Sequence, residues 1–161
     1  MSCNAELPHV LVIPEDDANR QVANGFHLGL DPERSRKLQV LPPVGGWQKV
    51  VKTFRRDHVA DMSRFPNRMV VLLFDFDGNG ERLIDVQKEV PAGLADRVFI
   101  LGAFGEPEDL KRAKLGTYEE IGRTMAQECR EDTDAIWNHE QLRHNQAELR
   151  RLRERARTIL F

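Results

Sequence analysis

The stretch VVLLFDFDG, residues 70–78, runs from apolar residues directly into two aspartates, Asp75 and Asp77. A continuous apolar run that ends at a glycine turn is typical of a parallel strand buried on both faces. Side chains two positions apart point to the same side of a strand, so the two carboxylates would share a side if the strand persists. Because like charges repel, a cation between them is the simplest reason for such a pair.

Strand and helix patterns alternate on both sides of this stretch. Short apolar runs at 9–14, 37–43 and 97–101 predict three further strands. The segments 15–30, 44–56 and 106–116 predict helices, and 79–90 predicts a short helix or a loop excursion. This alternation predicts an α/β domain with a Rossmann-like parallel sheet of about four strands and helices on both faces.

From residue 117 onward the pattern is wholly helical. We therefore expect an α/β domain over 1–116 and a helical C-terminal extension over 117–161, packed on the same domain. Heptad a/d spacing in the extension suits a protein–protein surface, and it is formed by Leu142, Leu149, Leu152, Ala156 and Ile159. Six arginines within 143–157 could contact phosphates or form a solvated face.

Composition restricts the class of protein. With 161 residues the chain is long enough for one ordinary domain, and a formal net charge of −2 is not the bulk signature of a nucleic-acid binder, although a local basic face remains open. Cys3 and Cys129 lie far apart and form no CxxC pair, which predicts a reducing compartment. No signal peptide or membrane span is visible, so we expect a cytoplasmic protein without a membrane partner.

Acids follow three of the four predicted strands. Ligand chemistry in parallel α/β sheets gathers at the carboxyl ends of the strands. The residues at these ends are Glu15, Gly45 with Gly46, Asp75 with Asp77, and Glu106 with Glu108. Carboxylate oxygens suit Mg²⁺ or Mn²⁺. We expect Glu15, Asp75 and Asp77 to be catalytic and to bind the metal, and Glu106 and Glu108 to bind a second cation.

Each of these residues also has a simpler interpretation. Glu15 could cap a helix, Asp77 could belong to a glycine turn, and Gly45–Gly46 could merely turn the chain. Glu106 and Glu108 could complement the N-terminal dipole of the helix that follows them. His139 and His144 are five residues apart, off the spacing of helical zinc pairs, and predict solvated or packing roles.

The order of these residues resembles the Toprim domain, which occurs in topoisomerases, bacterial primases and nucleases of the overcoming-lysogenisation-defect family. The resemblance covers about residues 9–115: Glu15 in VIPEDD, glycine in PVGGW, and the two aspartates in LLFDFDG. Glu106 in GEPEDL resembles a further acid of the nuclease branch. The sequence departs from primase-like members at Asp16 and Asn19, and Lys111 and Lys114 are the candidates for a basic residue of the nuclease site.

The resemblance implies magnesium- or manganese-assisted phosphoryl chemistry on DNA or RNA. Asp75 and Asp77, with Glu15, would hold the cation against a phosphate, and Glu15 could alternatively act as general base. The implied function is a metal-dependent nuclease, or the nuclease subunit of a complex, in defence against foreign DNA such as that of phages.

Three other interpretations stay open. LVIPEDDANRQVANG and FILGAFGEPEDLKRAKLG resemble parts of a response-regulator receiver phosphorylated on Asp75, but Gly102–Ala103 replaces the expected hydroxyl and no Lys-Pro fifth strand follows. LLFDFDG resembles the nucleophile motif of haloacid-dehalogenase phosphatases, although Asn79 replaces the usual threonine. Finally, the chain could be a non-catalytic Toprim-like scaffold that binds an ATPase or effector, or a second copy of itself, through its C-terminal helix. Metal binding would separate an active site from a scaffold.

Overall fold

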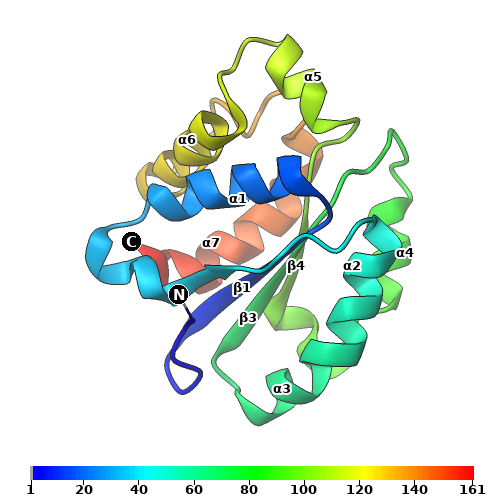
Figure 1. The fold of residues 1–161 in the computed structure, drawn as a ribbon, viewed down its shortest axis with the longest axis vertical. Coiled ribbons are helices and arrows are strands. Elements are labelled where there is room, and N and C mark those ends of the chain that lie inside the picture. Colours follow the sequence, from blue (N-terminus) through cyan, green and yellow to red (C-terminus); the bar gives the residue numbers. More distant parts are fainter. Residues whose placement is uncertain (1) are drawn as a thin grey trace.

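The computed structural model describes residues 2–161 and contains a parallel sheet of four strands. The strands are β1 (His9–Pro14), β2 (Leu38–Val40), β3 (Arg68–Leu73) and β4 (Val98–Leu101), in the order β2-β1-β3-β4 (Figure 1). β1 and β3 pair along their whole length, from His9 opposite Arg68 to Pro14 opposite Leu73. The α/β fold with four parallel strands is therefore confirmed.

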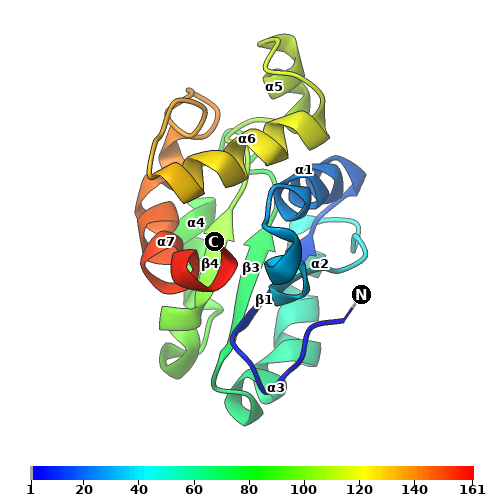
Figure 2. The ribbon, with the colours of Figure 1, turned by 90° about the vertical axis from the view of Figure 1, so that its left-hand side faces the viewer.

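Helices cover both faces of the sheet, as expected. One face carries α1 (Asp17–Leu28), α6 (Tyr118–Glu131) and α7 (Gln146–Leu160), which lie in front of the sheet in Figure 2. The other carries α2 (Trp47–Thr53), α3 (Val59–Arg64) and α4 (Arg82–Lys88), and the short helix α5 (Pro107–Arg112) follows β4. A π-helical turn, Phe54–His58, joins α2 to α3, and 3₁₀ turns span Pro32–Lys37, Ala92–Arg97 and Arg143–Asn145. No helix within residues 2–161 is long and apolar enough to cross a membrane.

The strands alternate between two hydrophobic cores, which explains their unbroken apolar sequences. Val10 and Val12 of β1 belong to the core under α1, α6 and α7, whereas Leu11 and Ile13 belong to the core on the opposite face. A strand with helices on both sides needs apolar residues at every position, and the sequence provides them.

Two glycines allow α6 to lie close against α1. A Cβ atom added to Gly25 of α1 would lie 2.0 Å from the carbonyl oxygen of Glu119, and one added to Gly122 of α6 would lie 2.0 Å from that of Val22. Both distances are far below van der Waals contact, so any larger residue would force the two helices apart. The contact explains why α6 packs on α1 rather than extending away from the domain.

The C-terminal segment is not wholly helical, in contrast to its pattern. α6 ends where Asp132 adopts a left-handed conformation with φ of 57°, and residues 132–145 form a connection built mainly of turns. The heptad-spaced residues Leu149, Leu152 and Ala156 of α7 are buried in the same core as Phe99 and Leu101 of β4. The spacing therefore reflects packing of α7 on the chain's own sheet.

Polar side chains near and on α7 pair with the outer edge of β4. Asn145 accepts a hydrogen bond from the Gly102 N–H at 3.1 Å and donates to the Gly102 carbonyl at 3.0 Å. Glu148 accepts from the Ile100 N–H at 3.0 Å, and Arg151 donates to the Val98 carbonyl at 3.3 Å. An edge strand otherwise exposes unpaired backbone groups. These three side chains pair with the backbone groups that a fifth strand would otherwise satisfy. The fifth strand of a response-regulator receiver is therefore not present at this edge of the described sheet.

Candidate functional site

The two central strands meet at a topological switch point. The chain leaves β1 through α1 on one face of the sheet and leaves β3 through α4 on the opposite face. In open α/β sheets, the crevice formed where neighbouring connections diverge is the usual ligand site. Glu15 directly follows β1 and Asp75 lies two residues after β3, so both predicted acids are placed at this crevice.

Glu15 and Asp75 are in direct contact. The Glu15 Oε2 atom accepts a hydrogen bond from the Asp75 backbone N–H at 2.7 Å. The side chain of Asp75 is buried, and its Oδ1 atom accepts from Asn19 Nδ2 at 3.3 Å. Asn19 is in turn held by Asp16, whose Oδ1 atom accepts from both the backbone and the side chain of Asn19 at 2.9 Å. The sequence indicated Asn19 only as a departure from primase-like Toprim members, yet it contacts the central acid.

Electrostatics set Asp75 apart from an ordinary surface carboxyl. Burial, and then the neighbouring charge of Glu15, raise the pKa of Asp75 to about 8, and the hydrogen bond from Asn19 opposes this only in part. Burial likewise raises the pKa of Glu15. The charged groups that act on Asp75 are Glu15, Asp16 and Asp77, all of them acids. The pair therefore needs a proton or a cation at neutral pH.

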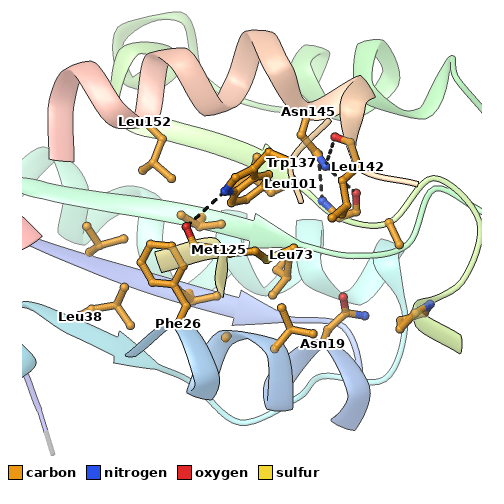
Figure 3. Close-up of a pocket in the computed structure, with 18 of the residues that line it drawn as sticks. Asn19, Phe26, Leu38, Leu73, Leu101, Met125, Trp137, Leu142, Asn145 and Leu152 are labelled. Carbon is orange, nitrogen blue, oxygen red and sulfur yellow. Dashed lines mark hydrogen bonds between the residues drawn. The ribbon is translucent and has the colours of Figure 1, made fainter. Parts of the chain in front are cut away.

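An apolar cavity of about 80 Å³ lies between the sheet and the layer formed by α1, α6 and α7 (Figure 3). Asn19 lines this cavity and also bonds Asp75. The Trp137 Nε1–H, a polar group in the wall, donates to the Met125 carbonyl at 3.2 Å. An apolar wall offers little hydration, which agrees with the burial of Asp75.

Asp77 lies close enough to act on the charge of Asp75, but its environment is different. β3 ends at Leu73, and the backbone at Asp77 is left-handed with φ of 50°. The Asp77 side chain is 53% exposed and forms an ion pair with Arg82 at 2.6 Å. The same Arg82 nitrogen, Nη1, donates to the backbone carbonyl of Asp75 at 2.9 Å. One aspartate is thus buried, and the other is exposed and neutralised.

Arg82 was not among the predicted site residues. Its guanidinium lies 4.6 Å from the centre of the Trp47 ring, and its side chain is only 12% exposed. A signal was available in the sequence, since Arg82 is the only lysine or arginine between residues 69 and 87. Of the predicted basic candidates, Lys111 has its ammonium 4.3 Å from the centre of the Tyr118 ring, and Lys114 is exposed.

Glycines form an open rim around the acids. The Gly45 N–H donates to the Glu15 carbonyl at 2.7 Å, and φ values of 88° at Gly45 and 145° at Gly46 exclude most other residues. A Cβ atom added to Gly46, Gly78 or Gly80 would meet no heavy atom within 4 Å. The space beside these three glycines is therefore unobstructed.

Glu106 and Glu108 are less closely connected to the site. Both are exposed, and the Glu106 N–H donates to the Asp109 carboxylate at 3.1 Å in a contact at the start of α5. Glu108, Asp16 and Asp75 all raise the pKa of Tyr118, after burial as the largest cause, which places Glu108 on the same side of the molecule as the acid pair. A second cation at Glu106 and Glu108 stays a prediction.

The donor atoms fit a hard cation only in part. Glu15 and Asp75 supply carboxylate oxygens, and Mg²⁺ is often held by one or two carboxylates with water and phosphate oxygens. However, no group of three or more His, Cys, Asp or Glu side chains in residues 2–161 is arranged to hold a metal ion. The expected third ligand, Asp77, is paired with Arg82.

His144 has a packing role. Its ring lies 4.7 Å from the centre of Phe76 and 5.5 Å from that of Phe104, and burial lowers its pKa to about 4. The neutral ring supports Phe76, which separates the two aspartates in the sequence. His139 is half-buried and accepts a hydrogen bond from the Gln141 N–H at 3.2 Å.

No protein-family model matches the chain, and no curated protein or solved structure matches it either. The resemblance to Toprim domains therefore rests on the residues of the crevice and on their order in the chain.

Proposed function

We propose that this protein is a metal-dependent phosphodiesterase that cleaves DNA or RNA, with Glu15 and Asp75 at the centre of a Mg²⁺ or Mn²⁺ site. The observation that carries the proposal is the contact between Glu15 and the buried Asp75 at the switch point of the sheet. The charged side chains that act on Asp75 are all acids, and each of them raises its pKa. A divalent cation would convert this unfavourable arrangement into a favourable one.

The residues of the site would have different roles. Glu15 and Asp75 would bind the cation, and Asn19 would keep the Asp75 carboxyl oriented. Asp77 would be a third ligand after leaving Arg82. A cation bound here would supply charge stabilisation for the phosphoryl oxygens and a bound water of lowered pKa. Glu15 could alternatively act as the proton acceptor instead of a cation ligand.

A basic face beside the crevice supports a nucleic-acid substrate. It is formed by Lys49, Lys52, Arg55 and Arg56, all exposed on α2 and the π-helical turn. A Cβ atom on Gly45 would lie 3.8 Å from the Lys49 ammonium, so the face reaches the rim of the crevice. Lys52, Arg55 and Arg56 line a shallow groove. Lysines and arginines in such a row attract a phosphate backbone.

The alternatives have less support. The heptad residues of α7 are buried in the chain's own core, so they do not offer the partner surface that a scaffold would need. A partner protein bound through the outside of α7, a homodimer and a role in phage defence stay predictions. The receiver interpretation lacks both a fifth strand and a hydroxyl after β4.

We expect the wild-type protein to bind Mn²⁺ in isothermal titration and the Asp75→Asn, Asp77→Asn double variant to bind none. The matched control is the Asp31→Asn, Asp96→Asn double variant, which loses two exposed carboxylates at other places and should bind like the wild type. Cleavage of plasmid, single-stranded DNA and RNA in Mn²⁺ then identifies the substrate. Absence of Mn²⁺ binding by the wild type would contradict the proposal.

The basic face gives a second test. The Lys49→Glu, Lys52→Glu variant should bind a fluorescent oligonucleotide more weakly in EDTA, and the slope of log K against log salt should fall by about 1 to 2. Among residues 2–161 neither lysine forms an ion pair, so the change breaks no internal contact. The Arg36→Glu, Arg150→Glu variant makes the same charge change at exposed sites outside this face. An equal loss in both variants would rule out a specific role for the face.

A further inference from the structure

We infer that Arg82 is an intrinsic counter-ion that holds Asp77 away from the cation site, so that a divalent cation must displace Arg82 to gain Asp77 as a ligand. We call this ion pair of Arg82 and Asp77 the latch. The inference rests on the proposed function and assigns a positioning role to a residue outside the predicted catalytic set.

The position of Arg82 is defined by contacts on several sides. Its Nη1 atom bridges the Asp77 carboxylate, at 2.6 Å, and the Asp75 carbonyl, at 2.9 Å. Its guanidinium packs on the Trp47 ring. Although Arg82 is the first residue of α4 and lies next to exposed Glu81, only 12% of its side chain is exposed. An arginine fixed in this way is not a solvated surface charge.

Two unfavourable features accompany the latch. The Nε–H of Arg82 is buried and has no hydrogen-bond partner in the described chain. Asp77 is one of three non-glycine residues in residues 2–161 with a positive φ. An unpaired buried donor and a left-handed aspartate both cost free energy. Release of Asp77 would free the planar donor fork of Arg82 for a phosphate, which it fits geometrically.

The latch and the cation compete for the same carboxylate. Asp77 has one negative charge, and it either pairs with the guanidinium or joins Glu15 and Asp75 around a cation. The apparent affinity for the cation is then reduced by the fraction of molecules in which Asp77 is held. Removal of the guanidinium should therefore tighten cation binding, whereas the loss of a purely structural arginine should not.

The test measures Mn²⁺ affinity by isothermal titration in a double-mutant cycle. We expect Arg82→Met to bind Mn²⁺ about fivefold or more tightly than the wild type, in the range of ordinary coupling between sites. Arg82→Lys, which keeps the charge, should stay within about twofold of the wild type. Arg155→Met removes an exposed arginine that pairs with Asp96, outside the basic face, and should leave the affinity unchanged. Arg82→Gln replaces the methionine variant if the latter does not fold.

The Asp77→Asn background separates the latch from general electrostatics. If Arg82 acts through Asp77, the Arg82→Met, Asp77→Asn variant binds Mn²⁺ no more tightly than Asp77→Asn alone. A gain that survives in this background would overturn the inference, because it would reflect only the loss of a nearby positive charge. An unchanged or weaker affinity of Arg82→Met, with normal wild-type binding, would overturn the inference alone. Absence of Mn²⁺ binding by the wild type would overturn it together with the proposed function.

Discussion

The Asp75→Asn variant should be more stable than the wild type in metal-free buffer at pH 9, by on the order of 3 to 5 kcal/mol in the free energy of unfolding. The pKa of Asp75 is about 8 in the folded protein and has its ordinary value of 3.8 in the unfolded chain. The folded state therefore holds a proton that the unfolded state has released. Stability is complete below pH 3.8 and is lost progressively as pH rises to about 8, and asparagine removes this loss.

Urea unfolding in EDTA at pH 6, 7.5 and 9 measures this effect. The stability gain of Asp75→Asn should grow up to about pH 8 and then level off, because up to that pH the folded wild type keeps a proton that the unfolded chain has released. Asp85→Asn, an exposed position on α4, should show no such trend. Saturating Mn²⁺ should stabilise the wild type and not Asp75→Asn, by about 2.7 kcal/mol at a hundredfold excess over Kd. A gain that is the same at every pH would mean that Asp75 does not titrate in this range.

The Asn145→Leu variant should lose about 3 kcal/mol of unfolding free energy. Asn145 is 2% exposed and makes both an N–H and a C=O contact with Gly102 at the end of β4. Leucine has a similar size but leaves both backbone groups of Gly102 buried and unpaired, at about 1–3 kcal/mol for each group. Partial access of water to Gly102 would reduce the summed cost of its two unpaired groups. Thermal or urea unfolding measures the resulting change in unfolding free energy.

Two further substitutions identify the cause. Asn145→Asp keeps the shape and the acceptor but removes the donor to the Gly102 carbonyl, so it should also be destabilising at neutral pH. Asn138→Leu makes the same chemical change at an exposed position and should alter the stability by less than about 0.5 kcal/mol. If Asn145→Leu were neutral, the edge of β4 would be satisfied in another way.

The closing of the sheet edge shows what pattern reasoning could not reach. Asn145, Glu148 and Arg151 lie within 143–157, whose six arginines could contact phosphates or form a solvated face. In the structure Glu148 is 3% exposed and bonded to β4. Periodicity reports which residues are apolar along one helix, but not which backbone groups of a distant strand need partners.

The sequence by itself determined the layers of this protein. Unbroken apolar runs at β1, β3 and β4 require cover on both faces, and the helical segments between the strands supply it, so an α/β sheet follows from local patterns. It also predicted that Glu15 and Asp75 lie at one edge of the sheet, because the carboxyl ends of parallel strands gather there. Their contact depends on β1 and β3 being neighbours, which the fold shows.

Only the tertiary structure decided the state of the acids. Strand periodicity predicted that Asp75 and Asp77 share a side if the strand persists, but it could not predict that Asp75 is buried while Asp77 is exposed and paired with Arg82. Asp75 is buried by residues from distant parts of the chain. Its contact with Asn19 joins segments 56 residues apart, and the stacking of Arg82 on Trp47 joins two further segments. Burial and charge at a point in space are sums over all neighbours, and those neighbours are fixed only when the chain has folded.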